Sequence, residues 1–479
     1  IWVRVAVLFT FIREFSEVKL NYKRTFLNPA QLFVASFLLI IIIGSLLLML
    51  PNATYQGISF VDAFFTSTSA VCVTGLIVVD TGSYFTQFGQ TIIMILIQLG
   101  GLGILTFASY FSYFFKGGSS YENQLVLSDM TSSKKLGEVF STLKYILLIT
   151  LTIEVTSGIL IYTSLNPLDF TSNFEQIYFS VFHAISAFCN AGFSTLSNSL
   201  YQDGFKFNYG LQLIIIITFV LGGLGFPIVS NLVNYVKYQI GRILTLGKKE
   251  EIHRPWVLNL NSRITLITTT AITAVAFVVF YVLEYNNTLS EHQGFGKVIT
   301  ALFGAATPRT AGFNSIDTAS MLFPTTMMVF LLMWIGASPA STGGGIKTST
   351  FAIATLNIIS LAKGKGRIEI FRREIAAISV RRAFAIISLS LIVIGLGIML
   401  ISIFDPHQEL IDIGFECFSA YSTVGLSLGI TAELSTASKL VLVGVMFVGR
   451  VSMLTIVIAL FKKVKHKNYR YPTEEITIN

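Results

Sequence analysis

Four glycines recur along the chain at nearly equal steps, and each follows a short apolar segment. The steps between Gly75, Gly192, Gly312 and Gly425 are 117, 120 and 113 residues. Main-chain carbonyl oxygens that converge on an axis can replace the water shell of a cation. Successive carbonyls point the same way only where one residue adopts a conformation that side chains oppose, and glycine adopts it at little cost. The pattern therefore predicts four carbonyl-bearing segments that coordinate a cation.

The residues expected to line this cation path are each glycine and the two residues before it. They are Val73, Thr74 and Gly75; Asn190, Ala191 and Gly192; Thr310, Ala311 and Gly312; and Thr423, Val424 and Gly425. The first and last sets are closest to the TVGYG loops of potassium channels. A single copy would be read as a turn between helices, but repetition at a fixed period disfavours that interpretation. Residues 71–74 are expected to be strand-like.

The composition places these segments in a membrane protein. Of the residues, 53% are hydrophobic and 12% charged, and the mean hydropathy is +0.72, whereas soluble domains carry about 25% charged residues. Several runs approach the ~20 apolar residues that span a bilayer. Irregular backbone persists at that depth only where protein buries it or where it lines a water-filled path. We therefore predict an all-α polytopic membrane protein in which four non-identical helix–pore loop–helix repeats surround a pseudo-fourfold ion pore.

Each repeat should consist of an outer helix, a short half-helix, the glycine-bearing loop and an inner helix. The predicted repeats are residues 29–120, 121–240, 241–362 and 363–461. Outer helices are expected near residues 30–50, 145–165, 264–283 and 383–404, and inner helices near 90–115, 211–236, 327–335 and 439–461. Residues 1–28 form either the end of an extra helix or an interfacial amphipathic helix, without a cleavable signal. Residues 462–479 are expected to form a cytoplasmic tail.

The net charge of +8 reflects membrane topology rather than nucleic-acid binding. Of the 33 Lys and Arg residues, 27 fall in the five segments 1–24, 116–144, 237–263, 363–382 and 462–470, which are the two ends and the connections between repeats. Connections inside the repeats carry acids instead, among them Asp62, Asp80 and Glu175. Because positive charge marks the cytoplasmic side, we expect both termini inside and the pore loops entering from outside.

The third inner helix is the most irregular, because GASPASTGGGIKTST interrupts it at residues 336–350. Three consecutive glycines and a proline cannot hold a straight helix. A broken helix at this depth belongs beside a water-filled cavity. The run Gly343, Gly344, Gly345, Ile346 and Lys347 could also suggest a phosphate cradle, but Ile346 breaks the Walker-type spacing between the last glycine and the lysine.

Several polar side chains need an explanation at or near membrane depth. Arg450 is the only cation within an apolar span of about 20 residues, which favours a buried functional arginine over one that snorkels to the interface. Arg309 is expected to point behind the third loop and to pair with an acid. Glu154 could attract cations or serve as a structural hydrogen-bonding group. His292 is expected to be a solvated loop residue.

The motifs together resemble a known family. VCVTGLIVVDT, FCNAGFS, TPRTAGFNSID and YSTVGLSLG, with GASPASTGGGIKTSTF and VGRVSMLT, are similar to the Trk/Ktr/HKT potassium-transport family over roughly residues 28–461. The closest likeness is to the membrane subunit of bacterial Ktr and Trk systems. It implies a K+-selective filter, a homodimer in the bacterial plasma (inner) membrane, and a cytosolic regulatory ring that senses ATP and ADP. It also implies an intramembrane gate at residues 336–350, with Arg450 beside it.

The resulting prediction is K+ uptake through a carbonyl-lined filter, in contact with membrane lipid and without an organic cofactor. A Na+-coupled or Na+-permeable secondary transporter would explain the broken helix but not four repeats, since inverted repeats give a twofold pattern. Whether Na+ or H+ is coupled stays open. An embedded enzyme is disfavoured because no constellation of His, Asp, Glu and Ser recurs at depth. Cys72, Cys189 and Cys417 are interpreted as buried small hydrophobes rather than metal ligands.

Overall fold

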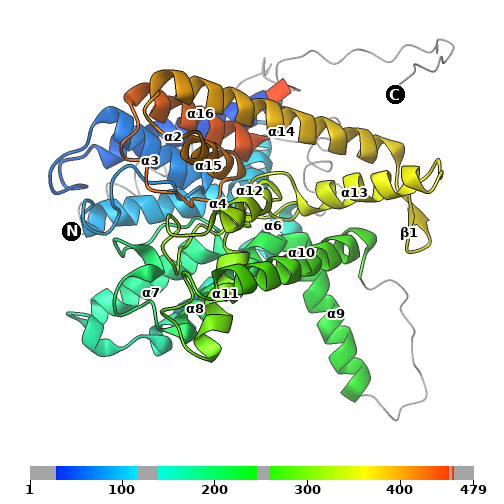
Figure 1. Ribbon diagram of the computed structural model, residues 1–479, viewed down its shortest axis with the longest axis horizontal. Coiled ribbons are helices and arrows are strands. Elements are labelled where there is room, and N and C mark those ends of the chain that lie inside the picture. Colours follow the sequence, from blue (N-terminus) through cyan, green and yellow to red (C-terminus); the bar gives the residue numbers. More distant parts are fainter. Residues whose placement is uncertain (1–28, 117–138, 245–257, 453–455, 458–479) are drawn as a thin grey trace.

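The structure is a computed structural model that describes residues 29–116, 139–244, 258–452 and 456–457. These residues form a bundle of α-helices (Figure 1) with one antiparallel hairpin, β1 (Glu369–Ile370) and β2 (Arg373–Glu374). The predicted end segments, residues 1–28 and 462–479, lie outside the described residues.

Four helical units follow one another along the chain, each with a long outer helix, a short helix and an inner segment. The first contains α2 (Pro29–Leu48), α3 (Phe60–Cys72) and α4 (Gln87–Lys116). The second contains α6 (Val139–Ser164), α7 (Asn173–Phe188), α8 (Tyr209–Leu224) and α9 (Phe226–Leu244). The third contains α10 (Leu260–Glu284), α11 (Phe295–Ala306), α12 (Phe323–Trp334) and α13 (Thr348–Ala362). The fourth contains α14 (Ala377–Phe404), α15 (Leu410–Ser422) and α16 (Thr436–Val451).

The units close into a ring because the inner helix of each one packs against the short helix of the next. Thus α4 contacts α7, α8 contacts α11, α12 contacts α15, and α16 contacts α3. The first and last units are neighbours, and Figure 1 shows the blue α3 beside the red α16. This closure brings the loops that follow the four short helices to one place.

Two of the short helices begin at N-capping serines. The hydroxyl of Ser59 accepts a hydrogen bond from the amide of Asp62 at 3.1 Å, and that of Ser172 accepts one from the amide of Glu175 at 3.2 Å. Such N-caps satisfy amides that the helix leaves unpaired, and an acid in the first turn complements the helix dipole. These short segments therefore begin as helices even though each holds only about four turns.

The first short helix continues further than predicted. Val71 and Cys72 form the last turn of α3, so the prediction of strand-like backbone at residues 71–74 is wrong for these two. Both side chains are buried in the core, and this tertiary packing outweighs the β-propensity of valine. The helix ends at Val73, whose backbone is left-handed with φ 57°.

Three described helices are long and apolar enough to cross a membrane, namely Lys144–Ser164 of α6, Leu260–Glu284 (α10) and Ala377–Phe404 (α14). A fourth span results if α8 and α9 are counted together, but these two helices are bent by 108°. Other apolar helices, including α3, α11 and α12, are shorter and cannot span alone. Short helices that enter and leave the bundle are typical of re-entrant loops.

The predicted continuous inner helix at residues 211–236 is wrong, because it breaks at Gly225. This glycine has φ +78°, and a Cβ there would lie 2.8 Å from the carbonyl oxygen of Ala340. The break therefore comes from the close approach of residues 336–350, which leaves no room for a side chain. Pro227 then lies in the first turn of α9, where a missing amide is tolerated.

The other inner segments differ among themselves. In α4 a Cβ at Gly100 would lie 2.1 Å from the carbonyl of Val71, and one at Gly101 would lie 2.4 Å from Cys189 Sγ, so these glycines allow close packing. A continuous helix over residues 439–461 is wrong, because Ser452 has φ 72° and α16 ends before it. A left-handed residue cannot continue the hydrogen-bond ladder.

Candidate functional site

The four glycine-bearing loops share one backbone pattern. Gly75, Gly192, Gly312 and Gly425 are left-handed, with φ of 93°, 69°, 80° and 92°. The residues two positions earlier, Val73, Asn190, Thr310 and Thr423, are also left-handed, with φ of 57°, 59°, 68° and 50°. Such a conformation costs a non-glycine residue on the order of 1–3 kcal/mol and persists only where the surroundings enforce it. The predicted unusual conformation at the glycines is confirmed, and the earlier left-handed residue was not foreseen.

The amides of these loops are bonded back to the short helices. In three units the residue before the glycine donates to the carbonyl five residues earlier: Thr74 to Ser69 at 2.8 Å, Ala191 to Ser186 at 2.8 Å and Val424 to Ser419 at 2.9 Å. The amides of Gly75 and Gly425 reach the hydroxyls of Ser69 and Ser419 at 3.1 Å. Among the described residues, none donates a hydrogen bond to the carbonyls of the three-residue sets. Those oxygens remain available as ligands.

The four glycines meet around one axis. A Cβ at Gly75 would lie 2.4 Å from the carbonyl oxygen of Ala191, and one at Gly312 would lie 2.1 Å from that of Val424. A Cβ at Gly192 would lie 2.9 Å from Gly312 Cα, and one at Gly425 would lie 2.3 Å from the Thr74 carbonyl. Each loop therefore touches the next in the order of the sequence, and the fourth touches the first. Only glycine fits at these four positions, because backbone fills the space of a side chain.

Residues 336–350 lie against the left-handed residues of three units. Thr342 Oγ1 donates to Asn190 Oδ1 at 2.9 Å. A Cβ at Gly343 would lie 2.1 Å from Thr310 Oγ1, and one at Gly344 would lie 2.4 Å from Thr423 Oγ1. The broken helix thus crosses the ring of loops on one side, in direct contact with it, and the glycines allow this approach.

Two cations hold the crossing segment. Lys347 Nζ donates to the carbonyl of Gly343 at 2.5 Å. Arg450 donates one hydrogen bond to the carbonyl of Thr342 and another to that of Gly100 at 2.6 Å. Arg450 is buried, as predicted, but in the last turn of α16 rather than midway along a helix. Lys347 is bonded to the segment itself, which gives no support to a phosphate cradle.

The same two cations line a cavity of about 240 Å³ beside the crossing segment. Part of its wall consists of Gly101 of α4, Phe188 at the end of α7, Cys189 after it, and Phe226 of α9. A positively charged cavity wall opposes the passage of a cation. The arrangement can therefore hold an obstruction in place and raise the electrostatic cost of an ion at the same point.

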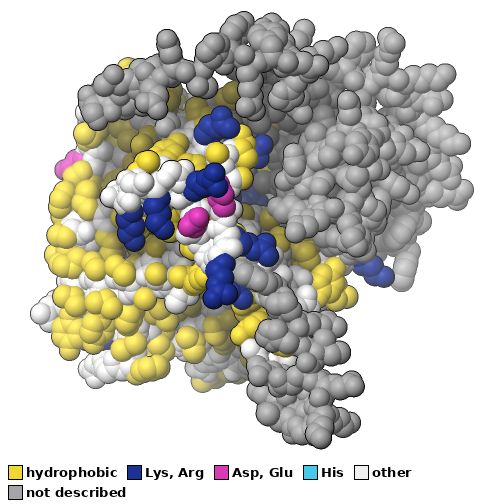
Figure 2. Space-filling model, turned by 90° about the vertical axis from the view of Figure 1, so that its right-hand side faces the viewer, with side chains coloured by type: hydrophobic (Ala, Val, Ile, Leu, Met, Phe, Trp, Pro, Cys, Tyr) yellow, Lys and Arg dark blue, Asp and Glu magenta, His cyan; other side chains and the backbone are white. Residues whose placement is uncertain are grey.

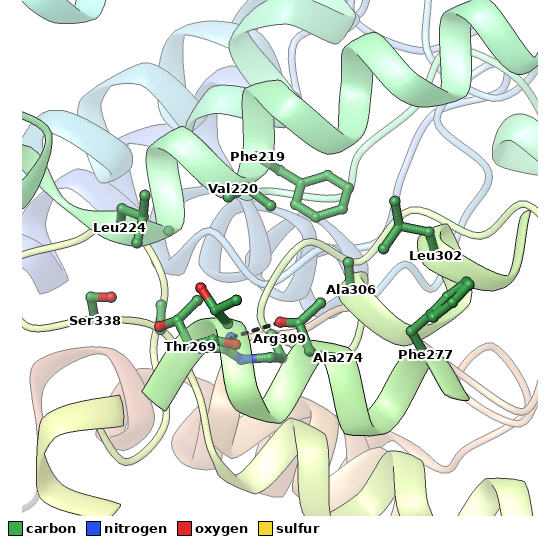
Figure 3. Close-up of a pocket in the computed structure, with 14 residues that line it drawn as sticks. Phe219, Val220, Leu224, Thr269, Ala274, Phe277, Leu302, Ala306, Arg309 and Ser338 are labelled. Atoms are coloured by element: carbon green, nitrogen blue, oxygen red, sulfur yellow. Dashed lines mark hydrogen bonds between the residues drawn. The ribbon is translucent and has the colours of Figure 1, made fainter. Parts of the chain in front are cut away.

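The prediction that Arg309 pairs with an acid is wrong. Its guanidinium donates to the Thr269 carbonyl at 3.3 Å, Thr273 Oγ1 at 3.2 Å, the Gly336 carbonyl at 3.4 Å and Thr348 Oγ1 at 3.1 Å. These acceptors are neutral, and they come from α10 and from the two ends of the broken segment. Neutral carbonyls and hydroxyls take the place of the expected acid because tertiary packing surrounds Arg309 with them. Figure 3 shows this arginine on the floor of a mainly apolar cavity.

Other polar side chains are mainly structural. Gln98 donates to Glu154 Oε2 at 3.2 Å, which favours the hydrogen-bonding interpretation of this acid. His292 is 1% exposed, so its prediction as a solvated residue is wrong. Tyr209, distant in sequence, covers it and bonds to its Nδ1 at 3.1 Å, and burial lowers the pKa of His292 below its ordinary value.

The three cysteines are buried, as the sequence analysis predicted. Cys72, Cys189 and Cys417 are free and buried. Among the described residues, no group of three or more His, Cys, Asp and Glu side chains is placed to hold a metal ion.

Sequence reasoning missed a pair of buried contacts behind the loops. His183 Nε2 and Ser194 Oγ lie 2.9 Å apart, and Ser427 Oγ donates to Glu416 Oε1 at 2.5 Å. His183 and Glu416 each lie nine residues before the glycine of their unit, and the serine that each contacts lies two residues after that glycine. These units face each other across the ring. The matched offsets were the available signal, because a polar pair recurs at the same positions relative to the glycine in the second and fourth units.

Comparison with known proteins agrees with this geometry. A sequence profile of the TrkH family, described as cation transport protein, matches residues 3–471. The chain is 37% identical to Ktr system potassium uptake protein B of Bacillus subtilis over 94% of its length and 96% of the relative. It is 35% identical to potassium/sodium uptake protein NtpJ of Enterococcus hirae, over 94% and 97% of the two chains.

A solved structure shows the same fold. The crystal structure of the potassium transporter TrkH from Vibrio parahaemolyticus matches with a TM-score of 0.70 at 19% identity, covering 92% of this chain and 86% of that one. At 19% identity, this similarity establishes the fold alone. The profile match and the relatives above 30% identity, together with the ring of glycine loops, show that the chain belongs to the TrkH family of cation transport proteins.

Proposed function

We propose that this protein takes up K+ across the cell membrane through a filter made of the carbonyls of the four three-residue sets. The observation that carries the proposal is the closed ring of left-handed glycine loops whose carbonyls accept no hydrogen bond from described residues. Carbonyl dipoles in such a ring can replace the hydration shell of K+. Relatives named as potassium uptake proteins support the choice of ion. No bond is made or broken, so the protein is a transporter and not an enzyme.

Residues 336–350 act as a gate in this proposal. Their contacts with Asn190, Thr310 and Thr423 close the path on one side of the filter. Opening requires the segment to leave these residues, and its run of three glycines permits that movement. Arg450 stabilises the closed position through the Thr342 carbonyl and repels K+ at the same point.

A basic surface offers a place for a regulatory partner. Figure 2 shows Lys and Arg side chains gathered near the end of the molecule that carries β1, and the exposed ones are Lys363, Lys365, Arg367, Arg372, Arg373, Arg381 and Arg382. Anionic lipid headgroups could account for such a surface at about 1 kcal/mol per basic residue. The family resemblance instead favours a cytosolic ring that senses ATP and ADP. We place this surface and both termini on the cytoplasmic side of the bacterial plasma membrane, in a homodimer.

An alternative is a transporter that is coupled to Na+ or lets Na+ pass. The name of the Enterococcus hirae relative, potassium/sodium uptake protein, favours keeping this candidate. The two proposals differ in permeation. A filter of aligned carbonyls passes K+ in preference to Na+, whereas a Na+-coupled carrier needs Na+ on one side and saturates with substrate.

The deciding experiment is a reversal-potential measurement on the purified full chain in planar bilayers, with K+ on one side and Na+ on the other. A K+-selective pore gives a reversal potential far from zero, with the Na+ side positive, and K+ current flows without Na+. A reversal potential near zero, or K+ movement that requires Na+, would reject the K+-selective filter and favour the alternative.

A further inference from the structure

A cavity of about 420 Å³ lies among α8, α10 and α11 and is not used by the proposed ion path (Figure 3). Phe219 and Val220 of α8, Phe277 of α10 and Leu302 of α11 give it mainly apolar walls. Its size falls within the ~300–1,000 Å³ of small-molecule sites, which are also mainly apolar with few polar groups. Arg309 supplies the charge at this site.

The charge of Arg309 is not neutralised by any described residue. Its four hydrogen bonds go to neutral oxygens at 3.1–3.4 Å, and its Nε atom is buried without a partner. No described carboxylate forms an ion pair with it. A cation at membrane depth is costly unless an opposite charge or strong hydrogen bonds compensate it. An anionic group in this cavity would provide that compensation.

The cavity opens toward the lipid side of the bundle. Two of its lining residues, Thr270 and Ala274, are exposed and lie on α10. This helix is one of those long enough to span a membrane, and only 11% of its apolar window is buried inside the protein. At 1.5 Å per residue, the opening lies roughly 15–21 Å along a helix about 37 Å long. A ligand at mid-depth must arrive through hydrocarbon rather than through water.

From these observations we propose that the cavity binds a long-chain carboxylic acid of the bilayer, with its carboxylate on Arg309 and its chain along Phe219, Phe277 and Leu302. A carboxylic acid can enter hydrocarbon in its neutral form, whereas a phospholipid headgroup stays charged and pays the full desolvation cost at that depth. The guanidinium then stabilises the ionised carboxylate by charge-assisted, two-pronged hydrogen bonds. The apolar walls accept the chain.

Occupancy of this site would bear on the gate. Arg309 precedes Thr310 of the third filter set, and it binds the carbonyl of Gly336, where the gate begins. Ser338 of the gate also lines the cavity. A bound carboxylate would compete for the hydrogen bonds that now tie Arg309 to these segments. This consequence rests on the proposed function, whereas binding itself is independent of ion conduction.

The binding test uses the full chain in phosphatidylcholine nanodiscs, labelled with palmitic acid that carries a photoreactive diazirine. Peptides bearing the label are identified by mass spectrometry. Saturable labelling of α8, α10 or α11 is expected, with competition by palmitate and none by its methyl ester. Equal competition by the ester would overturn the carboxylate–guanidinium contact. Labelling by a diazirine phosphatidylglycerol and not by palmitate would overturn the ligand class.

Two pairs of variants locate the site. Ala274→Trp should block the opening and abolish labelling, while Val275→Trp, on the same helix at a residue that is 65% exposed and does not line the cavity, should not. Arg309→Gln should weaken binding by about tenfold or more, because a charge-assisted pair is lost, and Arg309→Lys should retain part of it. If Arg309→Gln does not fold, the tryptophan pair decides. Unchanged labelling in Ala274→Trp would overturn the proposal.

Discussion

Gly75→Ser should lower the K+/Na+ permeability ratio of this protein. The glycine has φ +93°, a region that L-residues rarely adopt, and a Cβ there would lie 2.4 Å from the carbonyl oxygen of Ala191. The first and second loops would have to separate by roughly 0.6 Å to reach even 3.0 Å, the shortest separation that Cβ atoms tolerate. That movement rotates or displaces carbonyls of two of the four filter sets.

The size of the expected fall in the K+/Na+ permeability ratio follows from the backbone strain at Gly75 and from its contact with the Ala191 carbonyl. Left-handed backbone costs a non-glycine residue about 1–3 kcal/mol, and the segment can relieve it by turning its carbonyls off the axis. If selectivity loses about 1.4–2.8 kcal/mol of discrimination, the permeability ratio falls roughly ten- to a hundredfold. The matched control is Gly204→Ser. Gly204 has φ +92° but nothing within 4 Å of a Cβ, so the control carries the same strain outside the filter.

The assay is the bi-ionic reversal potential of wild type, Gly75→Ser and Gly204→Ser in planar bilayers. Size-exclusion profiles and thermal melts should first establish that each variant is folded. We expect the reversal potential to shift toward zero in Gly75→Ser alone. An unchanged reversal potential in a folded Gly75→Ser protein, or an equal shift in both variants, would refute the assignment of the glycine ring as the selectivity filter.

Three further outcomes are expected. Deletion of residues 340–345 should raise K+ flux into liposomes while K+ preference persists. Background flux from a folded variant would instead show that the segment supports the structure and is not a gate. Arg450→Ala should conduct more and respond less to the regulatory ring and its nucleotides, and identical nucleotide dependence of Rb+ uptake in variant and wild type would remove this residue from the gate. Ser427→Ala should reduce the K+/Na+ ratio about two- to tenfold, since a buried hydrogen bond contributes about 0.5–1.5 kcal/mol. Glu416→Gln, which keeps a hydrogen-bond acceptor, is the control and should change the ratio less.

The four glycine loops could be predicted from sequence because their signal is local and repeated. A left-handed backbone favours glycine wherever the chain is placed, and a period near 117 residues is visible without coordinates. The break at residues 336–350 was predictable for the same reason, since three glycines and a proline oppose a helix on their own. The burial of Arg450 was predictable because its charge lies inside an apolar run.

Tertiary structure decided the features that depend on partners distant in sequence. The break at Gly225 exists because the backbone of residues 339–340 occupies the space beside it. His292 is buried because Tyr209 covers it. Arg309 is bonded to neutral oxygens of Thr273 and Thr348 rather than to an acid. Residue type and spacing determined which backbone conformations the chain could adopt, whereas packing between separate units determined what each side chain contacts, because those contacts depend on the closed ring as a whole.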